Sequence, residues 1–151
     1  MPRPKTRIIL TYNLPYDLKE ICSSAEFLGV NHLHDYTLLY RGGILTAEPK
    51  KGHIVDVPVW MIAADEEKQI DNCFPAGIQK IDLTIPVSID DKIIKRKALL
   101  YIVDTKEPMS LPDPLYLRQV AEALIGSGVE HAPIFDAYTR TRQALINTAD
   151  A

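Results

Sequence analysis

Two histidines separated by one residue are the first candidates for a chemical site in this sequence. In an extended chain His32 and His34 point to the same side of the strand, close enough to share a metal ion. Their neighbours offer no obvious third ligand, whereas protein zinc sites use three or four. We therefore expect no metal and interpret both residues as surface or core-edge histidines.

An acidic run supplies the second group of candidates. Asp65, Glu66 and Glu67 could act as acid or base if one of them faced a pocket. They also stand where a helix is expected to begin, and carboxylates stabilise that end of the helix dipole. Both explanations stay open, with Glu66 and Glu67 as the candidate catalytic bases.

The remaining reactive side chains favour structural roles. The spacing of Cys22 and Cys73 fits neither a metal site nor a redox motif, so we expect two reduced, partly buried thiols in a cytoplasmic protein. Trp60 is interpreted as a core residue, with a stacking platform as the alternative. No Ser-His-Asp order and no glycine-rich phosphate loop stands out.

Length and composition limit the class of protein. The 151 residues predict a single domain over 1–151, and the apolar fraction of 46% is enough for a core. The net charge of −3 argues against a general nucleic-acid binder. The chain has no run of 18 apolar residues and no apolar segment typical of a signal peptide, so neither a membrane span nor a leader is expected.

The elements that would position these residues are organised around the stretch 54–75. Its apolar run 57–62 is typical of a strand buried on both faces, and Pro58 points to an edge or a bulge. A helix should begin at the acidic run and end before Pro75. The central feature is therefore a buried strand that leads directly into a short helix.

The rest of the chain reads as strands first and helices last. Strict alternation over 79–87 predicts a half-buried strand, and the turn at Asp90 and Asp91 returns the chain as its hairpin partner. Further strands are expected at 7–12, 25–29, 34–40, 44–47 and 93–103, a polar loop at 48–52, and helices at 16–23, 113–126 and 133–147. This order predicts an α+β fold, a curled mixed sheet or small barrel flanked by helices. The basic cluster 92–97 is either a solvated sheet edge or an anion-binding surface.

Five segments, taken in order, resemble the γ-glutamylcyclotransferase-like family, including its short phage and bacterial members. The matching segments are 25–29 with 35–42, 44–51, 57–71, 97–103 and 111–117. Members of this family catalyse an internal acyl transfer, in which the α-amine of a γ-glutamyl amine attacks the side-chain carbonyl and 5-oxoproline is released. The resemblance implies that a glutamate in an L-D-x-x-E-G motif takes the proton and that a Y-G-S-N turn offers backbone N–H groups.

This sequence departs from the family pattern in both motifs. Read without a gap from Ile70 and Asp71, the positions of the glutamate and its glycine fall on Phe74 and Pro75, and with a small deletion the pair is missing altogether. Thr11 stands where the turn has glycine. A phenylalanine cannot accept a proton, and loss of a general base typically removes about 10²–10⁴-fold of rate. The resemblance therefore implies a degenerate active site.

The leading hypothesis is a binder of a small molecule or of a host protein, with no cofactor. The expected ligand pocket comprises Leu10, Thr11, Tyr12, Asn13, Leu14, Trp60, Phe74 and Tyr116. Because phenylalanine replaces glutamate, an apolar or aromatic ligand should suit this pocket. The alternative is an active cyclotransferase with Glu66 or Glu67 as a relocated base. The helix at 133–147 is expected to pack on its own domain, or on a second subunit of a homo-oligomer.

Overall fold

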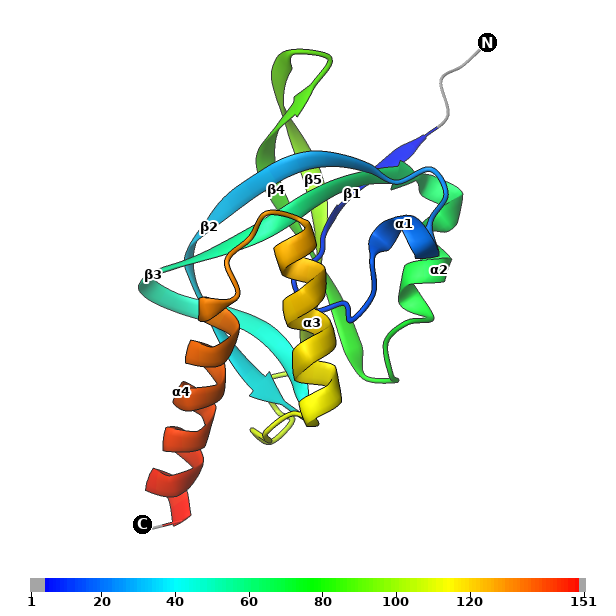
Figure 1. Ribbon diagram of the computed structural model, residues 1–151. Helices are drawn as coiled ribbons and strands as arrows, with labels where there is room; N and C mark the ends of the chain where they lie inside the picture. The colour runs from blue at the N-terminus through cyan, green and yellow to red at the C-terminus, as the bar shows by residue number, and fades with distance from the viewer. Residues whose placement is uncertain (1–4, 150–151) are drawn as a thin grey trace.

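The computed structural model describes residues 5–149 as one five-stranded mixed sheet with helices on both faces (Figure 1). The strand order is β2-β3-β1-β5-β4. The elements are β1 (Thr6–Leu10), α1 (Leu18–Ile21), β2 (Glu26–Arg41), β3 (Ile44–Ala63), η1 (Ala64–Glu66), α2 (Glu67–Asp71), β4 (Ile78–Ile89), β5 (Lys92–Val103), α3 (Pro114–Gly126) and α4 (Ala132–Ala149). Within this part of the chain, no helix combines the length and the apolar character needed to cross a membrane.

The centre of the sheet is the short strand β1, which is antiparallel to β3 and parallel to β5. Successive side chains of a strand point to opposite faces. Ile8 and Leu10 therefore enter one apolar cluster, and Ile9 enters another on the opposite face. All three side chains are fully buried, so both faces of the sheet are covered.

The strands β2 and β3 form one long hairpin, which corrects two expectations. The segments 25–29 and 34–40 belong to a single strand, and the expected loop 48–52 is part of β3. Irregularities in the pairing near Gly29 and Asp35 allow the long strand to bend, and both residues have positive φ. The Asp35 side chain accepts a hydrogen bond from the backbone N–H of Gly52, at 2.9 Å. The polar loop prediction is wrong because pairing on both sides of the segment, of Pro49 with Tyr36 and of Ile54 with His34, carries the strand through it.

Pro58 lies in β3, one pair from the irregularity between Phe27 and Gly29 of β2 and just beyond the last pair with β1, which agrees with the expected edge or bulge position. It pairs with Val30 of β2 on one side, and its carbonyl accepts a hydrogen bond from Thr11 N–H at 3.1 Å on the other. Thr11 is the first residue beyond β1, which ends at Leu10. The N–H that proline lacks would point toward Thr11, beyond the end of β1. The missing N–H therefore removes no hydrogen bond from the pairing of β1 with β3.

The hairpin of β4 and β5 has the predicted turn at Asp90 and Asp91, both with positive φ. It projects from the top of the sheet in Figure 1. The sheet curls until its outer strands approach, with Asn31 Nδ2 of β2 at 3.4 Å from the Pro86 carbonyl of β4. The predicted α+β curled mixed sheet is confirmed, and the curl stops before a barrel closes.

The helices divide between the two faces. α3 begins as predicted, because the Asp113 side chain accepts the Leu115 N–H at 2.8 Å and Pro114 follows it. α3 and α4 pack on the face of Ile8 and Leu10, whereas Leu18 of α1 and Ile70 of α2 belong to the opposite cluster. The short helices therefore flank the turn that follows β1 on the other side of the sheet.

Candidate functional site

The turn after β1 is built around the buried hydroxyl of Tyr12. This hydroxyl donates to the Tyr101 carbonyl at 2.5 Å and accepts from the Ala47 N–H at 2.9 Å. Burial raises the pKa of Tyr12 far above its ordinary value, so the phenol stays protonated. The side chain joins β1 to β3 and β5, which is a structural role.

Asn13 extends the same network. Its Nδ2 donates to the carbonyls of Leu45 and Tyr101, at 2.9 and 3.1 Å. Its Oδ1 is buried and has no partner among the described residues. The Tyr116 hydroxyl donates to the Asn13 carbonyl at 2.9 Å and accepts from Leu45 N–H at 3.2 Å, so α3 is tied to the turn. Three of the predicted pocket residues thus hold strands together.

Phe74 stacks on Tyr101, with ring centroids 4.8 Å apart and an interplanar angle of 18°. The hydroxyl of Tyr101 donates to the Asp71 carboxylate at 2.7 Å. Phe74 packs against the cluster on the α1 and α2 face of the sheet. At the position where the family resemblance places a general base, this protein therefore has a ring held in an aromatic stack.

The acidic run is engaged in contacts that fix α2. The Glu66 carboxylate accepts from the backbone N–H groups of Ser23 and Ser24, at 2.9 and 3.1 Å. Glu67 pairs with Arg7 at 3.1 Å and with Lys80 at 2.6 Å. The hydrogen bond that Lys80 donates to the Glu67 carboxylate is the main reason that the pKa of Lys80 is raised. These contacts give both glutamates a structural role, because they join α2 and the turn before it to neighbouring elements.

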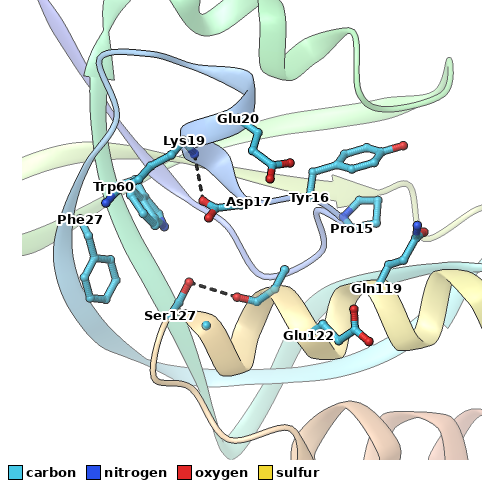
Figure 2. A pocket seen from close by; sticks show the side chains of 12 residues that line it. Pro15, Tyr16, Asp17, Lys19, Glu20, Phe27, Trp60, Gln119, Glu122 and Ser127 are labelled. Carbon is cyan, nitrogen blue, oxygen red and sulfur yellow. Dashed lines mark hydrogen bonds between the residues drawn. The ribbon is translucent and has the colours of Figure 1, made fainter.

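A cavity of about 460 Å³ opens between α1 and α3, and we call it the α1–α3 cavity. It is lined by Pro15, Tyr16, Asp17, Lys19, Glu20, Phe27, Trp60, Gln119, Glu122, Ala123, Gly126 and Ser127. Figure 2 shows Gln119 and Glu122 on α3 opposite the segment that carries Tyr16, Asp17 and Glu20. Its volume is in the range of small-molecule sites, which is about 300–1,000 Å³.

The aromatic end of this cavity consists of Phe27 and Trp60, whose ring centroids are 5.1 Å apart. Trp60 is only 6% exposed, because the rest of its ring packs in the cluster on this face. Thr11 and Leu14 line a much smaller hollow that also touches Trp60 and Tyr16. The cavity wall is thus continuous with the turn after β1.

The structure brings together only part of the predicted pocket. Thr11, Leu14 and Trp60 line neighbouring hollows on the α1 side. The others are placed elsewhere: Leu10, Tyr12 and Asn13 are buried in the core, Phe74 lies on Tyr101, and Tyr116 bonds to Asn13.

Sequence reasoning missed the acidic side chains of the cavity, Asp17, Glu20 and Glu122. A usable signal existed on α3, because positions 119, 122, 123 and 126 recur at the spacing of one helix face. That face is polar and small, and all four residues line the cavity.

The two histidines of β2 lie apart from this cavity. His32 contacts the Asp56 carboxylate through Nδ1, and His34 is exposed. Within residues 5–149 no group of three or more His, Cys, Asp or Glu side chains is arranged to hold a metal ion.

Cys22 is a fully buried free thiol in the cluster behind the cavity. Burial raises the pKa of this thiol to about 11, above its ordinary value near 9.0, and the neighbouring Glu66 charge adds to the effect. The unfolded chain therefore loses this proton first as the pH rises. Stability is complete below the unfolded pKa and falls between about pH 9 and about pH 11.

We expect the free energy of unfolding to fall by up to about 1.4 kcal/mol per pH unit from this thiol in that window. Replacing the thiol by Cys22→Ala should make the decline shallower, while buried tyrosines contribute equally to both proteins. Urea denaturation between about pH 8 and about pH 10 measures the two slopes. Equal slopes would show that Cys22 does not titrate differently on folding.

Comparison with known proteins gives structural likeness at low sequence identity. No protein-family model and no curated protein matches the chain. A solved structure described as a gamma-glutamyl cyclotransferase superposes with a TM-score of 0.68 at 15% identity, over 88% of this chain and 86% of that one. The structure of the uncharacterized protein loc79017 from Homo sapiens superposes with a TM-score of 0.66 at 16% identity, over 87% of this chain and 86% of that one. The structure of YkqA from Bacillus subtilis superposes with a TM-score of 0.67 at 11% identity, over 91% of this chain and 55% of that one.

Proposed function

We propose that this chain, which has the γ-glutamylcyclotransferase-like fold predicted from its sequence, binds a small molecule and has lost the cyclisation reaction. The observation that carries the proposal is the side chain at the base position. Phe74 has no proton acceptor, and its ring is stacked on Tyr101. Cyclisation requires removal of a proton from the attacking amine, which this residue cannot perform.

The turn after β1 supports the same conclusion. Thr11 replaces the glycine that would let the backbone approach a substrate closely. The hydroxyl of Tyr12 and the amide nitrogen of Asn13 are occupied by backbone partners in the core. A substrate would have to break these buried contacts to use either group.

The α1–α3 cavity supports binding. Its size suits a small molecule better than a folded host protein, and Trp60 with Phe27 provides an apolar, aromatic wall. A ligand with an aromatic or apolar body can bury that part against the two rings.

We expect no protein-dependent release of 5-oxoproline from a panel of γ-glutamyl dipeptides and γ-glutamyl amines. The expected deficit relative to a cyclotransferase with its base in place is at least about 10²–10⁴-fold. Mass spectrometry of the reaction mixtures measures the product, with circular dichroism confirming that the sample is folded.

Robust turnover would contradict the proposal, and glutamine variants would then locate the base. Activity abolished by Glu66→Gln or Glu67→Gln would establish the predicted relocated base. Activity abolished by Glu20→Gln or Glu122→Gln would instead assign the reaction to a carboxylate of the α1–α3 cavity.

A further inference from the structure

The α1–α3 cavity carries an excess of negative charge. Asp17, Glu20 and Glu122 line it, and Lys19 is the one basic residue among its lining side chains. Asp17 already accepts the backbone N–H of Lys19 at 3.0 Å and caps α1. Within residues 5–149, neither Glu20 nor Glu122 forms an ion pair. Two carboxylates on opposite walls are thus available to a ligand.

The aromatic end of the cavity faces a positive charge in the free protein. The Lys19 Nζ lies 6.0 Å from the centroid of the Trp60 ring, the separation at which a cation is attracted by the ring face. Tryptophan is the strongest of the aromatic side chains in this interaction. Lys19 is exposed, so its ammonium group can leave the ring at little cost.

Resting on the proposed binding function, we infer that the ligand of the α1–α3 cavity is an organic cation, a primary ammonium group joined to an aromatic or apolar body. The ammonium group binds between Glu20 and Glu122, and the body packs on Trp60 and Phe27. The Lys19 ammonium group competes with the ligand for the ring of Trp60 and the neighbouring carboxylates. An anionic molecule of the same shape would meet two unpaired carboxylates, which repel it.

Trp60 is the single tryptophan of the chain, so its fluorescence and its indole N–H resonance report on this cavity and the small hollow beside it, with no signal from another tryptophan. The probes are 2-phenylethylamine, the neutral 2-phenylethanol and the anionic 3-phenylpropionate, which share the phenyl body. We expect the amine to bind about four- to twenty-five-fold more tightly than the alcohol, because two exposed carboxylates contribute about two- to fivefold each. The anion should not bind, and added salt should weaken binding of the amine.

Three variants test the assignment of residues. Glu20→Gln and Glu122→Gln should each weaken binding of the amine about two- to fivefold and leave the affinity for the alcohol unchanged. Lys19→Met should strengthen binding of the amine by a similar factor. Glu107→Gln, at an exposed carboxylate outside the cavity lining, is the matched control. Equal binding of amine and alcohol would overturn the cation inference and leave the proposed binding function intact. No response to any probe by either readout would overturn both.

Discussion

Replacing Asn13 by aspartate is expected to lower the free energy of unfolding by about 3–5 kcal/mol. The Asn13 Nδ2 donates to two backbone carbonyls, and the residue is 1% exposed. A carboxylate there would be a buried charge that faces two acceptors and has no cation to pair with. The effect should shrink as the pH falls from the raised pKa of the buried carboxyl toward the unfolded pKa near 4, because the folded protein takes up the proton first and a protonated carboxyl can donate again. Urea denaturation at several pH values measures both parts.

Two control variants separate charge from lost hydrogen bonds. Asn13→Ala removes the donor without adding charge, so we expect a smaller loss of about 1–3 kcal/mol, partly offset because the unpartnered Oδ1 also disappears. Asn31→Asp, at the open edge of the sheet, should change stability by less than about 1 kcal/mol. An Asn13→Asp protein as stable as Asn13→Ala would show that water reaches this site.

Truncation of Trp60 to alanine is also expected to lower the free energy of unfolding, by about 3–5 kcal/mol. The side chain is nearly buried and packs with Ile9, Leu14 and Leu18 in the cluster between the sheet and α1. Its removal leaves a cavity that β3, paired on both sides, cannot collapse to fill. Because the variant has no tryptophan, circular dichroism should follow its unfolding.

Phe27→Ala is the matched control, because Phe27 contacts the same ring but is 40% exposed. We expect a loss of about 1 kcal/mol or less for it. If both substitutions cost the same, Trp60 would contribute only its contact with Phe27, and the stabilisation expected from its packing in the cluster behind the cavity would be wrong.

Local signals in the sequence were sufficient for several elements. The alternation over 79–87 requires one apolar face, and Ile85 and Val87 are buried in the core. Asp113 accepts the Leu115 N–H at the start of α3, and Pro114 has no N–H that needs a partner, so neither depends on a distant residue. Such features depend on neighbours in the chain, and the structure confirms them.

Long-range pairing decided what the local signals could not. The loop expected at 48–52 became part of β3 because β2 pairs with Glu48 and Pro49 and pairs again from Ile54 onward, which carries the strand through the unpaired residues between them. Pro58 is tolerated in β3 because β1 ends beside it. Neither fact has a local signature, since both depend on where another strand starts or stops.

The candidate site divides in the same way. The sequence by itself predicts that Phe74 falls at the base position of the motif that it resembles, because residue identity and chain order are enough for that prediction. Only the tertiary structure decided that Glu20 and Glu122 share a cavity with Trp60. α1 and α3 are distant in the chain and meet across the turn after β1 because apolar side chains behind them pack on opposite faces of one sheet. Burial of those side chains brings the carboxylates together, and no spacing in the sequence records it.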